Sequence, residues 1–484
     1  MELIALILVP FIGGALAAVA EGRHNAERWI TILSMAATVI VAGIAASSGA
    51  TNEDGWFLLH QTVWAPTLGV SLQLGLDGIS AALIIMAAGL GLICAVVSWN
   101  EITERSGLFH MSVCWTVATA IGVFLALDLL IFVFFFEAML LPSFVLIALY
   151  GHENREAAGF KYLIFNAVGG LGLLAAVIAL AAMADEMTFD AFKLSALGLD
   201  PQIQLWLLLA FSLAFLTKLP AIPLHAWLPD AHTEAPTAGS ILLAGVLLKA
   251  GGYGLYRFAP MLFPEGLAIA APWGMALGVA GALYGGLVAC GQNDAKRLVA
   301  YTSVAHMGLV LLGIAAGTEL ARTGAAIEMV AHGFSAAALF LLVGALQHRC
   351  GTRDMRELGG LQQRAPRFAA AFGLFLAAAL AMPGTANFVG EVLVIIGTFQ
   401  VNWPVAVLAI FSLIISVVYA TRPFGSIVFG KGEGRGAVRD LDPNELFALA
   451  VLAVGTLAIG LFPQFLVDII EPSAAMMRQV VATP

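Results

Sequence analysis

Apolar runs long enough to cross a lipid bilayer recur along the whole of this chain. A helix of about 20 apolar residues spans the hydrocarbon core. The composition agrees, since 61% of the 484 residues are hydrophobic and only 11% are charged, against about 25% charged residues in soluble domains. We count about fourteen runs of spanning length, at 3–20, 28–47, 78–98, 110–127, 128–150, 158–184, 205–229, 236–258, 266–290, 299–317, 323–347, 368–399, 403–430 and 445–468. The pattern predicts an all-α polytopic membrane protein.

Lysine and arginine are distributed unevenly between the two sets of loops. The loops after odd-numbered runs hold Arg23, Arg28, Arg105, Arg155, Lys161, Lys296, Arg297, Arg349, Arg353, Arg356, Arg364, Arg367, Lys431, Arg435 and Arg439. The other loops and the C-terminal tail hold Lys193, Arg257, Arg322 and Arg478, and the runs themselves hold Lys218, Lys249 and Arg422. Because basic loops stay in the cytoplasm, we expect the first set to face the cytoplasm and both termini to lie outside.

Two of the apolar runs contain residues that break a helix. Lys218 stands beside Pro220 in one of them, and Pro383 interrupts the other. A proline inside a helix removes one hydrogen bond and clashes with the preceding turn, at a cost of about 3 kcal/mol. Irregular backbone at membrane depth is tolerated only where protein surrounds it or where it lines a water-filled cavity. Both breaks are therefore expected inside the helix bundle.

The positions of the two breaks predict how the chain is divided. Interrupted segments at matching places in two halves are typical of inverted-repeat transporters. We expect three N-terminal spans with an outer loop at 1–109, two inverted five-helix repeats at 110–258 and 266–430, each with a broken helix, and a last helix at 445–468. Within the outer loop, Phe57–Val63 and Val70–Leu76 alternate apolar and polar residues, which predicts a β-hairpin.

Titratable side chains lie in the middle of several runs. A lysine at the bilayer centre costs roughly 2.5–3.5 kcal/mol, so such residues usually mark ion or proton pathways. The candidates for proton transfer are Glu137, Lys218, Lys249, His306, His332 and Glu391, with His225, Glu328 and Asp128 as accessory candidates. The structural alternative is that these groups form salt bridges or hydrogen bonds that fix helix packing, with Asp128 as a helix cap. His232 follows in a proline-rich turn and is expected to lie in a loop.

Other classes of site are disfavoured by what the sequence contains. The four cysteines are isolated from one another and from histidine clusters, so we expect no metal or iron–sulfur site in this chain. No glycine-rich phosphate-binding pattern stands between a strand and a helix, so we expect no nucleotide cofactor. The net charge of −9 with thin, mixed loops gives no basis for nucleic-acid binding.

Several long motifs resemble a known family. They are FFFEAMLLPSFVLIALYG, KLPAIPLHAWLPDAHTEAPTAGS, DAKRLVAYTSVAHMGLVLLGI, MVAHGFSAAALFLLVGALQ and MPGTANFVGE. Over essentially its whole length the chain resembles the antiporter-like membrane subunits of respiratory complex I, most closely the M branch. In that branch the position of Glu391 carries a glutamate, whereas the L and N branches carry a lysine. Too few residues follow the last run for the long lateral helix of the L branch.

The resemblance implies a role for most of the candidate residues. Glu137 and Lys218 match the glutamate–lysine pair on the input side, and Lys249 matches the central lysine. His306 and His332 match the linking histidines of the family. Glu391 matches the residue on the output side.

The resemblance also implies partners and a location. The chain would translocate protons in a bacterial inner membrane, with subunits L and N on either side and lipid around it. NADH, FMN, iron–sulfur clusters and quinone would be bound by partner subunits and none by this chain, which would carry no catalytic residue. The alternatives are a subunit of a multisubunit cation/proton antiporter or membrane-bound hydrogenase, and a purely structural scaffold. The cost of the buried charges disfavours the scaffold.

Overall fold

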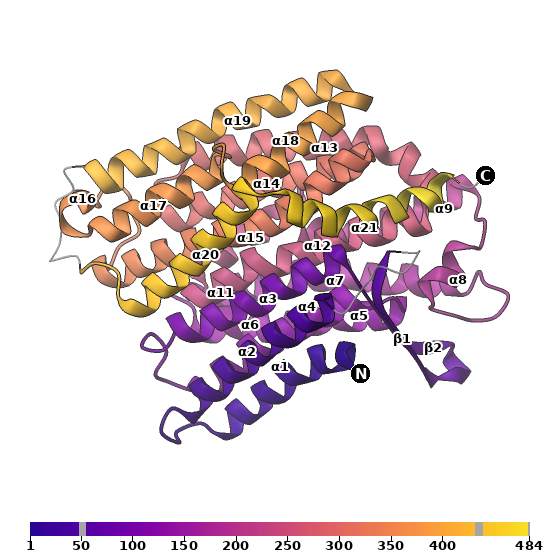
Figure 1. Ribbon diagram of the computed structural model, residues 1–484, viewed down its shortest axis with the longest axis horizontal. Coiled ribbons are helices and arrows are strands. Elements are labelled where there is room, and N and C mark those ends of the chain that lie inside the picture. The colour runs from indigo at the N-terminus through magenta and orange to yellow at the C-terminus, as the bar shows by residue number, and fades with distance from the viewer. Residues whose placement is uncertain (48–54, 431–438, 483–484) are drawn as a thin grey trace.

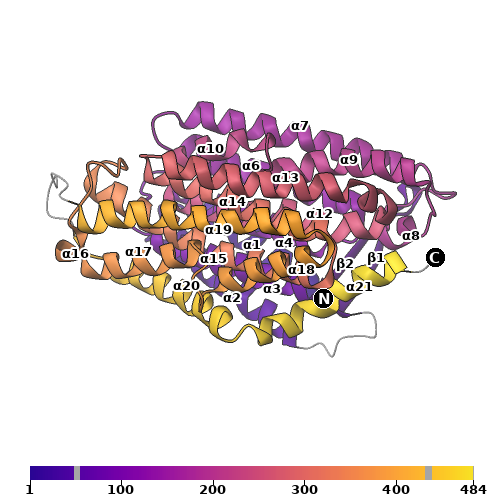
Figure 2. The same ribbon diagram turned by 90° about the horizontal axis from the view of Figure 1, so that it is seen from above.

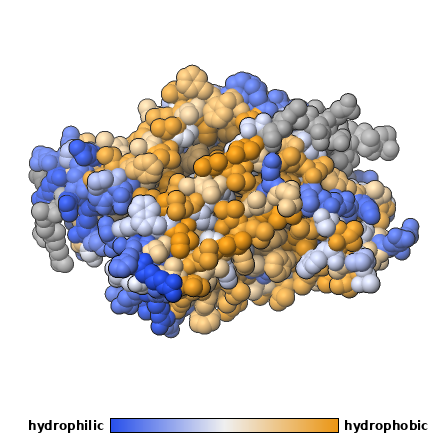
Figure 3. Space-filling view, turned by 60° about the horizontal axis from the view of Figure 1, so that its bottom comes forward, coloured by the Kyte–Doolittle hydropathy of each residue, from blue (hydrophilic) through white to orange (hydrophobic). Residues whose placement is uncertain are grey.

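The computed structural model describes residues 1–47, 55–430 and 439–482. Its helices run side by side along the long axis of the molecule (Figures 1 and 2). In the described part of the chain, 13 helices are long and apolar enough to cross a membrane, and two shorter apolar helices form one further, broken span. Figure 3 shows apolar side chains across the broad middle of one face and hydrophilic ones at both ends. The prediction of an all-α polytopic membrane protein with about 14 spans is confirmed.

The elements follow the chain in order. The first part contains α1 (Glu2–Val19), α2 (Ala26–Ser47), β1 (Trp56–Ala65), η1 (Pro66–Leu68), β2 (Val70–Asp77) and α3 (Gly78–Val97). The middle contains α4 (Ser106–Leu125), α5 (Leu129–Ala138), α6 (Leu140–Tyr150), α7 (Arg155–Ala181), α8 (Ala191–Ser195), α9 (Pro201–Lys218), η2 (Leu224–Trp227), α10 (Leu228–Glu234), α11 (Thr237–Leu242), η3 (Leu243–Leu247) and α12 (Leu248–Leu262). The last part contains α13 (Pro264–Gly291), α14 (Ala295–Ala316), α15 (Glu319–Cys350), α16 (Leu361–Arg364), α17 (Pro366–Ala379), α18 (Ala386–Val401), α19 (Trp403–Phe424), η4 (Gly425–Phe429), α20 (Pro443–Leu461) and α21 (Gln464–Ala482).

The two ends of the bundle differ in what they carry. One end, which we call the basic end, consists of the connections 98–105, 151–154, 292–294 and 351–365, the last of which includes α16. Arg422 lies there too, and it donates hydrogen bonds to the Gln292 carbonyl at 2.9 Å and to Asn293 Oδ1 at 2.7 Å. The opposite end, the hairpin end, carries β1, β2 and α8, and α1 begins and α21 ends toward it (Figure 1). Lys431 and Arg435, two of the basic loop residues, lie outside the described residues.

The first predicted break is present between α9 and η2. The chain leaves the helix after Lys218, and the Ala221 N–H closes the end by donating to the Leu216 carbonyl at 2.8 Å. The Thr217 carbonyl, which the break frees, accepts a hydrogen bond from Trp227 Nε1 at 2.9 Å. A freed carbonyl inside a bilayer needs such a partner, because hydrocarbon offers none.

The second predicted break, between α17 and α18, is closed in the same way. The Met382 N–H donates to the Ala377 carbonyl at 3.0 Å, and the freed Ala379 carbonyl accepts from the Tyr419 hydroxyl at 2.9 Å. Gly384 has a φ of 95°, a conformation that favours glycine. Both broken helices are therefore confirmed, while the division into repeats at 110–258 and 266–430 stays a prediction.

The C-terminal segment differs from the expected span at 445–468. Helix α20 ends at Leu461, and Pro463 precedes a separate helix, α21, which packs against α3, α12 and α15. Its contact with α3 is close: the Gly78 N–H donates to Ser473 Oγ at 3.1 Å, and a Cβ on Gly78 would lie 1.7 Å from the Ile469 carbonyl oxygen. The apolar residues after Pro463 thus cover the hairpin end instead of extending the last span.

A buried ion pair joins the hairpin to the bundle. Arg257, which the sequence analysis assigned to a loop, lies in α12 and pairs with Asp77 at 2.5 Å, and both side chains are almost fully buried. Ser80 Oγ also donates to Asp77, and the Arg257 guanidinium lies 5.0 Å from the ring of Trp56 in β1. The hairpin itself is antiparallel, as predicted, with Trp56 opposite Asp77. The pair therefore connects β1, β2, α3 and α12.

We expect this pair to be essential for stability. Replacing Arg257 with leucine leaves the Asp77 carboxylate buried without its partner, which should cost about 3–5 kcal/mol of unfolding free energy. Adding Asp77→Asn removes the unpaired charge and should recover most of the loss. The control is Arg356→Leu, because the Arg356–Asp354 pair is solvent-exposed and such pairs contribute about 0–1 kcal/mol. Thermal unfolding of the purified protein in detergent measures all three variants, and equal effects of Arg257→Leu and Arg356→Leu would contradict the expectation.

Candidate functional site

Lys249 lies at the centre of the polar residues inside the bundle. Its side chain is fully buried, and Nζ lies 2.5 Å from the Ala244 carbonyl oxygen and 2.7 Å from His332 Nδ1. Ala244 belongs to the π-helical turn η3, which directly precedes α12. Such a turn changes the i to i−4 hydrogen-bond pattern and is frequent at functional sites. Here it presents a backbone carbonyl to the lysine five residues later.

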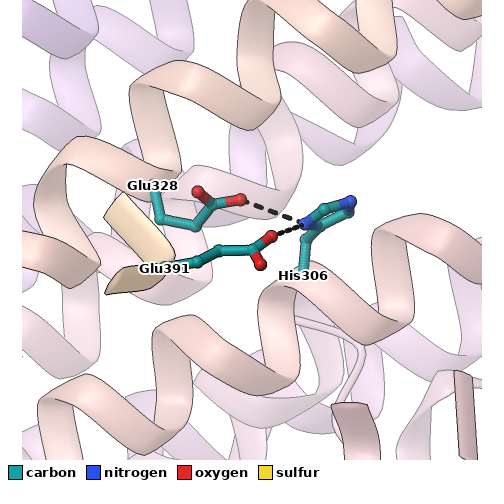
Figure 4. Close-up of side chains that lie close together, drawn as sticks. All are labelled: His306, Glu328 and Glu391. Carbon is teal, nitrogen blue, oxygen red and sulfur yellow. Dashed lines mark ion pairs between the residues drawn. The ribbon is translucent and has the colours of Figure 1, made fainter. Parts of the chain in front are cut away.

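The contacts continue from His332 toward α18 through a second histidine. The rings of His332 and His306 lie 5.4 Å apart between centroids. His306 Nδ1 lies 2.8 Å from a carboxylate oxygen of Glu391 and 3.2 Å from one of Glu328. Figure 4 shows both carboxylates pointing at the same nitrogen. Lys249, His332, His306 and Glu391 therefore form one succession of neighbouring titratable groups, which we call the central path.

Small residues allow the helices that carry these groups to approach closely. A Cβ on Gly390 of α18 would lie 2.8 Å from the Cα of Glu328, and one on Gly324 of α15 would lie 2.6 Å from the Val394 backbone nitrogen. Glycine at such contacts is typical of tightly packed membrane helices. The close packing of α15 against α18 places Glu328 and Glu391 within reach of one histidine. Asn387, also on α18, donates from Nδ2 to Glu328 Oε1 at 3.0 Å.

Several polar atoms of this region lack a hydrogen-bond partner within the described residues. They include His306 Nε2, His332 Nε2, Glu328 Oε2 and Asn387 Oδ1. Leaving a buried polar atom unpaired costs about 1–3 kcal/mol. Buried water typically satisfies such atoms where a site is polar and offers several partners. The atoms are thus suited to bind bridging water molecules.

Three of these residues have the spacing of metal ligands. One ligand atom each from His306, Glu328 and Glu391 lies within 4.8 Å of the other two. One nitrogen and two carboxylate oxygens are a donor set that zinc accepts, so this is where the described residues could hold a divalent cation. We interpret the group as part of a proton path, because His306 also lies against His332 and through it against Lys249.

Lys218 and Glu137 are neighbours that do not form an ion pair within the described residues. Lys218 Nζ donates to the Phe136 carbonyl at 2.7 Å and lies 3.5 Å from the centre of the Phe136 ring. Glu137 points instead toward α7, where a Cβ on Gly170 would lie 1.7 Å from its Oε1. Both residues lie inside the bundle, as the sequence predicted. The expected ion pair between the Lys218 ammonium and the Glu137 carboxylate is not formed within the described residues.

Two of the three accessory candidates lie apart from the central path. Asp128 caps α5 by accepting from the Leu130 and Ile131 N–H groups, and its second oxygen accepts from the Ser71 N–H of β2. This is the structural alternative considered for Asp128. The ring of His225 packs against that of Tyr284, with 5.2 Å between the ring centroids, and within the described residues it contacts no carboxylate or lysine of the central path. Of the three accessory candidates, only Glu328 contacts a residue of the central path, namely His306.

The sequence analysis assigned to loops two residues near the basic end that are buried and titratable. His232, expected in a loop, is fully buried in α10 and stacks on Phe340 with 4.5 Å between ring centroids. Lys296, counted among the loop residues, is fully buried in the first turn of α14. Asp294 caps that helix by accepting from the Arg297 N–H. An aspartate at this position signals a helix start, and it could have placed Lys296 inside the helix.

The chain matches one family of membrane proteins along most of its length. Residues 126–416 match the family described as NADH:quinone oxidoreductase/Mrp antiporter, transmembrane. NADH-quinone oxidoreductase subunit M of Pseudomonas aeruginosa is 42% identical over 495 residues, covering 98% of this chain and 96% of that protein. The subunit of the same name from Escherichia coli is 40% identical over 494 residues, covering 98% and 97%.

Solved structures of membrane complexes contain chains with the same fold. A chain of respiratory complex I from Thermus thermophilus superposes with a TM-score of 0.90 at 32% identity, with 100% of both chains covered. A chain of the Mrp complex from Dietzia superposes with a TM-score of 0.86 at 25% identity, covering 100% of this chain and 52% of that one. The likeness to the first extends over both whole chains, whereas the second contains a large part without a counterpart here.

The contacts of His306 lead to a prediction about stability. Replacing His306 with leucine removes the group that faces both buried carboxyls, and we expect a loss of about 1–3 kcal/mol of unfolding free energy. His225→Leu is the matched control, because that buried ring contacts tyrosines and no carboxylate. Thermal unfolding in detergent compares the two variants. If His225→Leu destabilises the protein as much as His306→Leu, the carboxylate contacts are not what His306 contributes.

Proposed function

The chain belongs to the family of M subunits of NADH-quinone oxidoreductase, and on that premise we propose that it is the proton-translocating, antiporter-like membrane subunit of such a complex. The observation that carries the proposal is the central path, which runs from Lys249 through His332 and His306 to Glu391. A bilayer offers protons no carrier, so translocation needs titratable groups joined by contact or water. These four groups supply them inside the bundle.

The path assigns a proton step to each residue. Lys249 gives a proton to His332 Nδ1, and the ring gives up its Nε2 proton through bridging water toward His306. Protonated His306 then passes a proton from Nδ1 to Glu391, which lies 2.8 Å away. Glu328 lies 3.2 Å from the same nitrogen, so the two carboxylates share the proton that leaves the histidine. Each step moves one proton, and afterwards each ring holds its proton on the nitrogen that accepted it. The rings of His332 and His306 must then turn over, or exchange that proton to the other nitrogen through water, before the next proton passes.

The input pair regulates this path by changing partners. Lys218 now donates to the Phe136 carbonyl, one residue from Glu137. A buried ammonium is destabilised by burial and stabilised by a nearby carboxylate. If Lys218 alternates between that carbonyl and Glu137, its proton affinity changes with the contact. A change of one pKa unit corresponds to about 1.4 kcal/mol, which a small rearrangement of side chains supplies.

The same proposal includes the partner subunits of the chain and its orientation in the membrane. NADH, FMN, iron–sulfur clusters and quinone are bound by partner subunits, and the free energy of quinone reduction drives the proton steps in this chain. The chain lies in the bacterial inner membrane between subunits L and N. The basic end faces the cytoplasm, since basic loops are retained there, and both termini face the periplasm.

The second candidate is a subunit of a cation/proton antiporter without redox partners. The match to the Dietzia Mrp complex supports this alternative as far as the fold is concerned. The M subunits are more similar, at about 40% identity along nearly the whole length of both proteins. Purification of the tagged chain from its native membrane decides between the two. Flavin and iron–sulfur subunits with NADH–quinone activity should copurify, and a redox-free assembly of membrane subunits would contradict the proposal.

Substitutions in the central path test the proton steps directly. In reconstituted vesicles of the whole complex, Lys249→Met and Glu391→Gln should each lower NADH-driven proton translocation by about tenfold or more, equivalent to at least about 1.4 kcal/mol of barrier. The matched control is Glu265→Gln, because Glu265 is exposed at the start of α13. Quenching of a pH-sensitive dye measures uptake into the vesicles. Unchanged uptake by both path variants would refute the assigned steps.

A substitution at Gly170 tests the position of Glu137 without removing any titratable group. A Cβ at Gly170 would lie 1.7 Å from Glu137 Oε1, so Gly170→Ala must displace the carboxylate from its site. We expect a several-fold slower proton translocation. The matched control in the same helix is Gly172→Ala, whose Cβ would meet Leu213 at an ordinary 3.6 Å. Equal rates for the two alanine variants would show that the position of Glu137 does not matter.

A further inference from the structure

Two buried carboxylates, those of Glu328 and Glu391, face the same nitrogen of His306 (Figure 4). The central path requires only one proton acceptor at this point. The two carboxylates have different surroundings, and the main difference is the side chain of Asn387 in α18. That side chain is fully buried and takes no part in the proton steps described above.

The Asn387 amide contacts one of the two carboxylates. Its Nδ2 donates to Glu328 Oε1 at 3.0 Å, and the same oxygen lies 3.2 Å from His306 Nδ1. An amide nitrogen donates hydrogen bonds and accepts none. A proton on Glu328 Oε1 would turn this acceptor from a carboxylate oxygen into a hydroxyl oxygen, and hydrogen bonds to ionised acceptors are the stronger ones. The contact therefore favours Glu328 without a proton.

The start of α18 acts on Glu328 in the same direction. Helix α18 begins at Ala386, directly after the break, and its N-cap Thr385 makes no side-chain cap. The Thr385 hydroxyl donates instead to the Met382 carbonyl at 2.8 Å. A Cβ on Gly390 would lie 2.8 Å from Glu328 Oε2, so the carboxylate lies along the first two turns of α18. The positive end of a helix dipole stabilises a negative charge placed there.

Glu391 lies differently. It follows Asn387 by one turn of α18, and its oxygen is the nearer one to His306 Nδ1, at 2.8 Å against 3.2 Å for Glu328. In the part of the chain that the structure describes, the Asn387 amide makes its hydrogen bond with Glu328 and none with Glu391. A proton that reaches Glu391 therefore weakens no contact with the amide.

From these contacts we propose that Asn387 is a positioning residue that holds Glu328 as a carboxylate, so that the proton which the two carboxylates share ends on Glu391. The inference deepens the proposed function and rests on it. In the step itself, the Nδ1–H bond of His306 breaks and an O–H bond forms on Glu391, while the electron pair stays on Nδ1. The ring becomes neutral, and Glu328 keeps the negative charge that stabilises the next imidazolium.

The test removes the amide and then removes the carboxylate that it holds. In reconstituted vesicles of the whole complex, Asn387→Leu should slow NADH-driven proton uptake several-fold, because Glu328 then retains the proton. Adding Glu328→Gln should restore most of the rate, since an amide at position 328 cannot retain a proton. If the double variant is no faster than Asn387→Leu, the inference is overturned and Asn387 has a structural role.

Asn166→Leu is the matched control for this rescue. Asn166 is also a buried asparagine, and its Nδ2 donates to the Tyr162 carbonyl of its own helix at 2.9 Å. Glu328→Gln should not speed up proton uptake by the Asn166→Leu variant. A general stimulation of both asparagine variants by Glu328→Gln would also overturn the inference.

Infrared difference spectra give a readout that a structural role would not change. During turnover, Asn387→Leu should show a protonated carboxyl band that is absent from the natural protein and is lost when Glu328→Gln is added. If no band of Glu328 appears in Asn387→Leu, Asn387 does not decide where the proton goes.

A further comparison applies if Asn387→Leu alone does not assemble. Replacing both members of a buried hydrogen bond costs less than removing one, so Glu328→Gln with Asn387→Leu is compared with Glu328→Gln alone. Equal proton uptake is expected, and a several-fold slower double variant would overturn the inference. Full uptake by Glu391→Gln would instead refute the proposed function itself, an outcome distinct from a failure to rescue Asn387→Leu.

Discussion

The ammonium group of Lys249, held inside the bilayer by a backbone carbonyl and a histidine, is the interaction on which the rest of the account depends. A lysine at that depth costs roughly 2.5–3.5 kcal/mol, and the fold offsets this with contacts to Ala244 and His332. Without the π-helical turn before α12, the Ala244 carbonyl would be occupied within a regular helix. Without the close packing around α15, the histidine would not be beside the amine. The site therefore requires both an irregular helix and a tightly packed neighbour.

Irregular backbone occurs at several of the titratable positions. The break after α9 directly follows Lys218, and α5 gives way to α6 at Met139, two residues beyond Glu137. The break before α18 precedes Glu391. At both broken helices a freed carbonyl is satisfied by a side chain, from Trp227 in one case and from Tyr419 in the other. The polar backbone and the polar side chains thus share one interior, which hydrocarbon alone would not stabilise.

The sequence predicted the number of spans, both broken helices, the hairpin and the residues of the central path, because apolar runs, prolines and charges at membrane depth are local signals. It did not predict which side chains contact one another. Glu328 was only an accessory candidate, and its contact with His306 depends on how closely α15 packs against α18. Asp128 proved to be a helix cap, and Arg257 proved to be buried against Asp77 in a long-range contact. Lys296 was missed because its place lies at the edge of an apolar run, where helix boundaries are least certain from sequence.

The most direct measurement of the central claim is an infrared difference spectrum of the whole complex, recorded between resting and NADH-driven states. The carboxyl band of Glu391 is identified by its loss in Glu391→Gln. The account predicts that this band changes during turnover in the natural protein and stays constant in Lys249→Met, because the proton that reaches Glu391 passes through Lys249. A band that changes equally in both proteins would contradict the path from Lys249 to Glu391.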